Sequence, residues 1–480
     1  VIQNCRDPDE PRDVALICPG GPPLVDLSYW KDIPKDKRYK SPWGESAERE
    51  LASGNPQYVT FEPDHGGFNN IRMQMETVLV FARATGRTLV MPPAQKFYLL
   101  KKPASEFADM FPVEAFREYM SVMSTEDFLE REGVTGRLGK VPPGNKSSGK
   151  ILSAIFWSYL REVAGSVPHW NHMTEALVFG PSPDQPEISN DEVSQEWLQQ
   201  FLTSQRTQLS YTEEMQRARL VHFRTSDGKD FEYRLFTHFY TFIGFIDPVA
   251  GRHHRRLVRD VVHFRESLFC VASNIVHRLR KMGGGSPGRW AGWHGEGGGL
   301  GGSGGWDLGG HRKAGFSTFH IRRGDFQYTR MKPPASTILT ATKDVRIRGE
   351  VLYIATDERD KSFFSDFKED HRIFFLDDFE DALKDVDSTY YLMIDTIVAS
   401  QGRAFIGTWR STFTGYITRL RGYYNYPTEF SWYFWDESKK DYQALSLAEE
   451  TTPRSPFFMR EWPTAWKDID EDIDEDIEVM

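Results

Sequence analysis

The sequence predicts an α/β protein with two Rossmann-like domains that face a cleft. In both halves of the chain, short apolar runs typical of buried strands alternate with helical patterns, and polar or glycine-rich loops follow the strands. A chain of 480 residues is also too long for one ordinary core. We expect an irregular lead-in over 1–56, an N-terminal domain over 57–250, a C-terminal domain over 251–460 and a disordered acidic tail over 461–480.

The first domain opens with a strand–loop–helix–strand pattern. Residues 58–61 are typical of a buried strand, and a glycine loop follows over 64–70. Apolar residues at helical spacing predict the next helix; they are Ile71, Met75, Val78, Leu79 and Ala82. Gly86 should end this helix, and residues 88–91 should form the next strand. The glycine loop would then lie at a helix N-terminus, where free N–H groups attract anions.

The second half repeats this alternation. We expect one amphipathic helix over 255–282, with a buried face of Leu257, Val261, Val262, Leu268, Val271, Ile275 and Leu279. From Gly283 to Gly310, 15 of 28 residues are glycine, which predicts a flexible insertion because ordering so much glycine costs entropy. The strands expected beyond it span 316–321, 351–355, 372–376 and 403–407, with helices over 382–400 and after residue 411. Polar loops follow three of these strands. Loops are also expected over 141–150 and 181–191.

Composition excludes several classes. The net charge of −10 comes mostly from the acidic run 468–478, so the rest is near neutral, unlike a nucleic-acid-binding protein. No uncharged apolar stretch is long enough to span a membrane, although a signal or anchor could precede Val1. Cys5 and Cys18 could pair in an oxidising compartment, leaving Cys270 single on a helix. We expect the ER or Golgi lumen, with a cytoplasmic location left open.

The segment His320-Ile321-Arg322-Arg323-Gly324-Asp325 follows an apolar strand. It would place cationic groups at the carboxyl edge of a sheet, where open α/β sheets bind ligands. Guanidinium groups there suit a phosphate or diphosphate, because they bind its oxygens bidentately and stay charged. The alternative is a structural corner in which the arginines form salt bridges with aspartate.

Three further loops add polar groups after strands. Gly66 and Gly67 allow close approach to a ligand, or serve only packing. Ser411 and Thr412 offer hydroxyl and N–H groups to an anion, or cap their own helix. Thr356-Asp357-Glu358 places a carboxylate suited to a base or a ribose hydroxyl, or forms a cap.

Taken together, these motifs resemble the GDP-fucose protein O-fucosyltransferase family over roughly residues 57–425. The order of Gly-Gly-Phe-Asn, His-Ile-Arg-Arg-Gly-Asp-Phe, Ala-Thr-Asp and Ser-Thr-Phe carries the resemblance. It implies a GT-B fold and inverting transfer of fucose from GDP-fucose to a hydroxyl of a protein or glycan, with no metal and no cofactor besides the donor substrate. The first domain would serve the acceptor and the second the donor.

The resemblance also implies roles for individual residues. Arg322 would stabilise charge on the departing GDP, whereas Arg323 would point away because neighbours on a strand face opposite sides. The donor pocket would further include His320, Asp325, Thr356, Asp357, Ser411, Thr412 and Phe413. The glycine loop would close over the diphosphate with Gly66, Gly67, Phe68, Asn69 and Asn70.

The sequence leaves the general base open. In one branch of the family a glutamate stands where this chain has Gly66, so His65 or Asp64 takes the proton, or no dedicated base exists. A related transferase with another donor, such as a rhamnosyltransferase, and an inactive nucleotide-sugar-binding protein remain alternatives. No metal site is expected, since the histidines lack ligands at metal spacing. The arginine-rich helix near 252–265 is interpreted as a solvated face.

Overall fold

The computed structural model describes residues 11–142, 153–180, 206–225, 239–284 and 315–434, apart from isolated positions, together with residues 235, 446–447, 466 and 469–470. Four predictions lie wholly or mostly outside this part of the chain: the loop over 181–191, most of the loop over 141–150, all but the first two residues of the glycine-rich insertion, and the acidic tail over 461–480 except residues 466 and 469–470.

The chain forms two compact units, each with its own sheets and helices. Unit 1 comprises residues 1–13, 30–263 and 472–480, and unit 2 comprises residues 14–29 and 264–471. The domain boundary therefore lies at His263–Phe264 rather than at residue 250, and the predicted lead-in is divided between both units.

Unit 1 contains a fully parallel sheet of β3 (Tyr58–Phe61), β4 (Thr88–Val90), β5 (Val122–Met123) and β8 (Leu220–Phe223) in the order β5-β4-β3-β8. A second parallel sheet has the order β7 (Thr207–Ser210), β6 (Glu175–Phe179) and β9 (Ile243–Phe245). The short strands β1 (Arg12–Asp13) and β2 (Lys31–Asp32) pair antiparallel. In the larger sheet the chain order reverses beside β3, since β4 lies on one side of it and β8 on the other.

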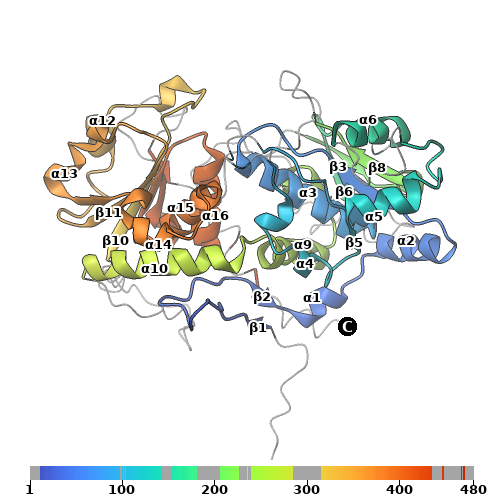
Figure 1. Ribbon diagram of the computed structural model, residues 1–480, viewed down its shortest axis with the longest axis horizontal. Helices are drawn as coiled ribbons and strands as arrows, with labels where there is room; N and C mark the ends of the chain where they lie inside the picture. Colours follow the sequence, from blue (N-terminus) through green and yellow to red (C-terminus); the bar gives the residue numbers. More distant parts are fainter. Residues whose placement is uncertain are drawn as a thin grey trace, which may run out of the picture. The chain divides into compact units, whose positions relative to one another are not determined.

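The described helices of unit 1 are α1 (Pro34–Arg38), α2 (Pro42–Ala52), α3 (Phe68–Thr85), α4 (Val113–Phe116), α5 (Thr125–Phe128), α6 (Ser153–Val163), α8 (Glu213–Arg217) and α9 (Pro248–Val261), with short 3-10 or π turns over Phe107–Asp109, Leu129–Gly133 and Phe239–Thr241. Helix α3 is the predicted helix after the glycine loop, and it packs against β3 and β4 (Figure 1). It ends at Gly86 with φ 69°, where a Cβ would lie 2.5 Å from the Cα of Gly44. Glycine is required there for both reasons.

Unit 2 is built on one sheet in the order β12-β11-β10-β13-β14-β15. Its strands are β10 (Phe316–Ile321), β11 (Val351–Thr356), β12 (Arg372–Phe374), β13 (Phe405–Gly407), β14 (Ser431–Tyr433) and β15 (Ser446–Leu447). All neighbours are parallel except β14 and β15. The first strand in the chain, β10, thus lies between β11 and β13. This reversal is the doubly wound pattern that the sequence predicts.

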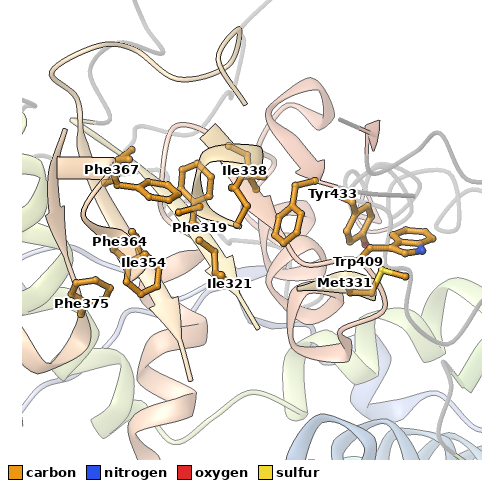
Figure 2. Packing of buried hydrophobic residues seen from close by; sticks show 14 residues of the cluster. Phe319, Ile321, Met331, Ile338, Ile354, Phe364, Phe367, Phe375, Trp409 and Tyr433 are labelled. Atoms are coloured by element: carbon orange, nitrogen blue, oxygen red, sulfur yellow. The ribbon is translucent and has the colours of Figure 1, made fainter. Parts of the chain in front are cut away.

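The described helices of unit 2 are α10 (Glu266–Met282), α12 (Ala335–Ala341), α13 (Phe367–Asp370), α14 (Glu380–Leu383), α15 (Tyr391–Ala399) and α16 (Thr412–Tyr423), with 3-10 turns over Thr329–Met331, Lys361–Phe364, Leu376–Phe379, Ser388–Tyr390 and Thr428–Phe430. Phe319 and Ile321 of β10 face an apolar cluster with Ile338 and Phe367 (Figure 2). On the other face, the Thr318 hydroxyl donates to the Ala399 carbonyl of α15 at 2.6 Å. Helices therefore cover both faces of the sheet, as buried parallel strands require.

Two predicted helices are wrong in extent. The helix expected over 255–282 is two helices, α9 and α10, and Val271 is only half-buried. The break occurs because consecutive residues pack in different units: the His263 ring stacks on Trp30 at 4.0 Å, whereas the Phe264 ring contacts Tyr416 at 5.7 Å. The helix expected over 382–400 is likewise divided into α14, a 3-10 turn and α15.

The interpretation of the arginine-rich helix as a solvated face is also wrong. Arg256 and Arg259 of α9 are buried, with relative exposures of 1% and 4%. Arg256 forms a bidentate ion pair with Asp36, and Arg259 pairs with Asp260. The Asp36 carboxylate that allows Arg256 to be buried is invisible to helical periodicity, because it lies 220 residues away in the chain.

Two described segments, around Cys18 and at Trp466, pack more than predicted. Cys18 forms a disulfide with Cys270 of α10, so the expected pairing with Cys5 is wrong. In the same segment the Val25 N–H donates to the Ser273 hydroxyl at 2.8 Å. Trp466, placed in the disordered tail, is buried against Tyr423 in unit 2. Burial of a large aromatic side chain outweighs the acidity of its neighbours.

Candidate active site

The point where the chain order reverses in unit 2 gathers the predicted motifs. His320 pairs in register with Ala355 of β11 and Gly407 of β13, so three strands end side by side. The Thr408 hydroxyl joins two of these ends: it accepts from the Arg322 N–H at 2.9 Å and donates to the His320 carbonyl at 3.0 Å. This is the crevice where doubly wound sheets bind ligands.

Arg322 lies in this crevice between two carboxylates. One terminal nitrogen of its guanidinium pairs with Asp357 and the other with Asp325. The relative exposures are 23% for Arg322, 24% for Asp357 and 48% for Asp325. The structure thus brings together three predicted site residues, and it also contains the salt bridges of the structural alternative. Because the pairs are open to water, an entering anion can exchange with a carboxylate.

Arg323 takes a different direction, as predicted. Its Nε donates to Glu358 at 2.9 Å and a terminal nitrogen donates to the Pro333 carbonyl at 3.1 Å. The guanidinium carbon lies 3.9 Å from the centre of the Phe363 ring. Its main-chain N–H donates to Asp357 at 2.7 Å, which fixes that carboxylate beside Arg322. The two arginines therefore have separate tasks.

Gly324 and Thr356 support the loops around Arg322, but neither has a side-chain group left for a ligand. A Cβ on Gly324 would lie 2.4 Å from Oδ2 of Asp357, so a side chain there would displace the carboxylate. Thr356 uses its hydroxyl within the fold: it donates to the Ile321 carbonyl at 2.7 Å and accepts from the Glu358 N–H at 3.0 Å. Thr356 thus holds two strand ends together.

His320 lies buried beneath the site, in contact with Thr414 and Phe413. It is buried, its Nδ1 lies 2.7 Å from the Thr414 hydroxyl, and its ring centre is 4.5 Å from that of Phe413. Burial, together with the charge of Arg322, lowers the pKa of His320 to about 3. The imidazole is therefore neutral at physiological pH and supports Arg322 and Phe413 without adding charge.

Helix α16 presents its N-terminus to the same strand end. Ser411 is the N-cap residue, but its side chain forms no capping hydrogen bond, and the first turn contains no acidic residue. The capping alternative for Ser411 is therefore wrong. Ser411 is buried, whereas Thr412 and Phe413 are half-exposed. The first-turn N–H groups and the helix dipole make this end favourable for an anion.

Sequence reasoning missed three residues of this site. Thr408 and Thr414 form hydrogen bonds at the carboxyl end of β10, and Arg410 adopts a left-handed φ of 62° in the turn before α16. The guanidinium carbon of Arg410 lies 5.0 Å from the ring centre of Tyr328. A non-glycine residue with positive φ frequently marks a functional turn. Their position close to Gly407 and Ser411 of the predicted motif was the only signal for them in the sequence.

The glycine loop of unit 1 follows β3, at the corresponding reversal point. Asp64 is buried, and its carboxylate accepts from the Gly66 N–H at 2.5 Å. His65 is exposed, and Gly66 and Gly67 are half-exposed. Asp64 therefore braces the loop, which leaves His65 as the accessible one of the two predicted bases.

The residues after the glycines turn inward. Phe68 is buried and stacks on Phe111 at 5.9 Å, and Asn69 is buried with its Oδ1 accepting from Arg72 at 3.2 Å. Asn70 is half-exposed, and its N–H donates to the Gly67 carbonyl at 2.8 Å. The side chains of Phe68 and Asn69 thus serve the interior of unit 1.

The comparison with family models decides the identity. The model described as GDP-fucose protein O-fucosyltransferase matches residues 58–424, well over half of the chain. The chain belongs to this family. It is accordingly a glycosyltransferase of the fucosyltransferase class, which confirms the resemblance and the enzyme class predicted from the motifs.

Solved fucosyltransferases are distant from this member of the family. POFUT1 in complex with GDP-fucose is 12% identical, with 76% of this chain and 94% of that chain covered and a TM-score of 0.33. NodZ alpha-1,6-fucosyltransferase soaked with GDP-fucose is 12% identical, with 82% and 98% covered and a TM-score of 0.40. An Arabidopsis thaliana FUT1 variant with GDP is 11% identical, with 84% and 76% covered and a TM-score of 0.36. No curated protein matches the chain. Family membership therefore rests on the family model.

The fucosyltransferase also contains a charged network around the buried Glu62 that the sequence did not reveal. Just before the glycine loop, Glu62 accepts from Arg161 at 2.6 Å and contacts His222 of β8 at 3.0 Å. Burial opposes ionisation of Glu62, but the bonds to His222 and Arg161 outweigh it and lower its pKa to about 2. Burial lowers the pKa of His222 as well. At the point where the strand order of unit 1 reverses, Glu62 is thus already bonded to Arg161 and His222.

The described residues were also compared with the patterns of membrane-spanning helices and metal sites. Within the described ranges, no helix is both long enough and apolar enough to cross a bilayer. The same part of the chain contains no group of three or more histidine, cysteine, aspartate or glutamate side chains arranged to hold a metal ion.

Proposed function

We propose that the protein transfers fucose from GDP-fucose to a hydroxyl of a protein or glycan acceptor, with inversion and without a metal ion. One observation carries this proposal: Arg322 and the N-terminus of α16, which has no side-chain cap, both lie where the strand order of unit 2 reverses. Together they supply the positive charge that a departing nucleoside diphosphate needs.

Exchange of partners at Arg322 is central to this mechanism. A diphosphate oxygen replaces Asp325, the more exposed carboxylate, while Asp357 remains fixed by the Arg323 N–H. Each charge-assisted hydrogen bond that strengthens as GDP departs contributes roughly 1.5–3 kcal/mol. The N–H groups in the first turn of α16, at Thr412 and Phe413, bind the other phosphate oxygens.

Inversion requires the acceptor oxygen to attack the fucose carbon opposite the departing phosphate, with loss of the hydroxyl proton. We assign this proton to His65, because Asp64 is engaged by the Gly66 N–H and His65 is exposed in the same loop. A His65→Gln variant should retain GDP-fucose binding and lose turnover. Unchanged turnover in this variant would mean that the reaction proceeds without His65 as base.

The donor is tested by calorimetric titration with GDP-fucose, GDP and UDP in the absence of metal. We expect selective binding of the guanine nucleotides, and its loss in Arg322→Ala. The matched control is Arg348→Ala, which removes an exposed arginine also paired with an aspartate, Asp370. Equal binding of UDP, or undiminished binding by Arg322→Ala, would contradict the donor assignment.

Release of GDP in an acceptor screen distinguishes transfer from binding alone. Turnover with GDP-fucose but not with GDP-rhamnose supports a fucosyltransferase, and the reverse supports a rhamnosyltransferase. Tight GDP-fucose binding without turnover for any acceptor supports an inactive nucleotide-sugar-binding protein. The Cys18–Cys270 disulfide favours an oxidising compartment, so we further propose the ER or Golgi lumen as its location.

A further inference from the structure

Arg410 stands in the short turn between β13 and α16, one residue before the N-cap of that helix. Residues 401–409 are buried, and Arg410 is the first half-exposed residue after them. Its φ of 62° lies in the left-handed region, which glycine adopts freely and a residue with a Cβ adopts only at a cost in free energy. A favourable contact of the arginine side chain is therefore expected to offset that cost.

The Arg410 side chain lies over an aromatic residue from another segment of unit 2. Its guanidinium carbon is 5.0 Å from the ring centre of Tyr328, a distance at which a cation is attracted to an aromatic face. Tyr328 belongs to the loop that carries Asp325. Arg410 therefore connects the turn before α16 to the loop that follows Arg322.

A second aromatic residue continues this connection back to Arg322. The rings of Tyr328 and Phe326 pack edge to face, with their centres 5.3 Å apart. The guanidinium carbon of Arg322 lies 6.0 Å from the centre of the Phe326 ring. The pair Phe326 and Tyr328, the aromatic bridge, thus links Arg322 to Arg410.

The aromatic bridge supplies the inward contacts of its loop. Of residues 324–330, only Phe326 and Tyr328 are half-buried, and the others are exposed. The loop leads to Met331, which is buried in the apolar cluster that also contains Trp409 of the turn before α16 (Figure 2). The loop and the turn therefore meet in the core and again nearer the surface, where the aromatic bridge makes the contact.

These two segments supply the two groups to which we assign diphosphate binding. The guanidinium belongs to Arg322 at the end of β10, and the free N–H groups belong to the first turn of α16. Both must reach one ligand, so a change in their spacing weakens both interactions. We propose that Arg410 and Tyr328 are positioning residues, which hold Arg322 and the α16 N-terminus at the spacing that a nucleoside diphosphate requires. This inference rests on the proposed binding of GDP at that place.

The aromatic bridge also bears on the exchange of partners at Arg322. When a phosphate oxygen replaces Asp325, the guanidinium keeps its ion pair with Asp357 and its contact with the Phe326 ring. Asp357 and Phe326 belong to different loops. The guanidinium is therefore held from two directions while one carboxylate leaves.

The coupling between the two segments can be measured without any ligand, by hydrogen exchange of the full chain. Arg410→Gly keeps the left-handed backbone and removes the contact with Tyr328, so it should speed exchange of the Met331 N–H, which donates to the Tyr328 carbonyl at 2.9 Å. Tyr328→Leu should speed exchange of the Gly415 N–H, which donates to the Ser411 carbonyl at 3.1 Å. Each substitution thus acts on the segment that it does not alter.

Calorimetric titration with GDP measures the consequence for the donor site. Arg410→Gly and Tyr328→Leu should each raise the GDP dissociation constant by about two- to fivefold, the range that one cation–aromatic contact at a half-exposed position supplies. The double variant should show about the same increase as either single variant, since both remove the same contact. Tyr328→Phe keeps the ring and should bind GDP as the wild type does.

The chain offers a matched control for the glycine substitution at the other end of α16. Asn425 also has a left-handed φ, of 55°, but it is exposed and follows the C-terminus of the helix. Asn425→Gly therefore removes a side chain from the same backbone conformation without altering the aromatic bridge. It should leave both the GDP dissociation constant and the exchange of the Met331 N–H unchanged.

Unchanged exchange of both N–H groups in the two variants would overturn the inference. So would GDP binding that Tyr328→Leu leaves unaffected, because Arg410 would then act through its charge alone. Additive losses in the double variant would also overturn it. Failure of the wild-type protein to bind GDP is a different result, which would contradict the proposed function and the positioning role with it.

Discussion

The two points at which chain order reverses have the same topology, but their carboxylates differ in exposure to water: Glu62 is 4% exposed, whereas Asp357 is 24% and Asp325 is 48% exposed. Beside β3 in unit 1, Glu62 and His222 are buried and Arg161 pairs with the same carboxylate. Beside β10 in unit 2, Arg322 and Asp325 remain open to water. In unit 1 the charged groups stabilise the fold. In unit 2 the Arg322 guanidinium can exchange a carboxylate partner for another anion.

The comparison shows that topology places a crevice but does not decide its use. A buried ion pair resists separation, because removing one partner strands the other charge at a cost of several kcal/mol. A half-exposed pair is worth little by itself, since water and salt screen it. Only the second kind can give up a carboxylate for a phosphate at low cost.

The largest expected effect is on stability in unit 1. Glu62→Ala leaves His222 and Arg161 without their partner and should lower the free energy of unfolding by about 3–5 kcal/mol, measured by urea denaturation. The matched control Glu162→Ala removes an exposed partner of Lys140 and should change it by less than about 1 kcal/mol. Equal losses in both variants would erase the contrast between the two reversal points.

Next in size is the effect of Arg322→Ala on turnover. We expect the rate of GDP release with acceptor to fall by about 10²–10³-fold, since a preorganised donor to the leaving group is removed. Stability should change by less than about 1 kcal/mol, because its ion pairs are partly exposed. A large stability loss with little change in rate would make Arg322 a structural residue like Glu62. Arg323→Ala should show the smaller loss of rate.

A pH series sharpens the comparison further. The pKa of His320 is about 3 in the folded protein, against about 6.5 when unfolded. Its contribution to stability is therefore complete above about pH 6.5 and is lost as pH falls from there toward 3. His320→Gln should flatten the fall in unfolding free energy between pH 6.5 and 5. An unchanged slope would show that His320 does not remain neutral in the fold.

The smallest expected effect is that of salt. Raising ionic strength from 0.05 to 0.5 M should weaken GDP binding severalfold, by about 1 kcal/mol, because the Arg322 site is hydrated. The stability difference between wild type and Glu62→Ala should change little with salt, since Glu62 and His222 are buried and only Arg161 is partly exposed. A strongly salt-sensitive difference would place Glu62 with the exposed pairs.

Local pattern was sufficient to predict the strands and much of the site in unit 2. Apolar runs located β10, β11 and β13, and parallel neighbours end at one edge, so His320, Arg322, Asp325 and Asp357 had to converge. The sequence could not show that Asp325 and Asp357 flank Arg322, because that depends on turn geometry.

What the sequence concealed depends on partners distant in the chain. Arg256 appeared solvated because its partner Asp36 lies 220 residues away, and Glu62 gave no signal because His222 and Arg161 are 160 and 99 residues away. The same holds for Cys18, whose partner is 252 residues downstream. Periodicity reports which face is apolar, but not which charges meet.

The disulfide between Cys18 and Cys270 also has a consequence for biosynthesis. Residues 14–29 belong to unit 2, yet the whole of residues 30–263 emerges before the helix that binds them. At 5–20 residues per second, the ribosome makes that intervening stretch in roughly 12–50 s. Residues 30–263 of unit 1 are thus inserted in the chain between the two segments of unit 2. During that interval Cys18 cannot form its bond with Cys270, so assembly of unit 2 must follow synthesis of residues 30–263.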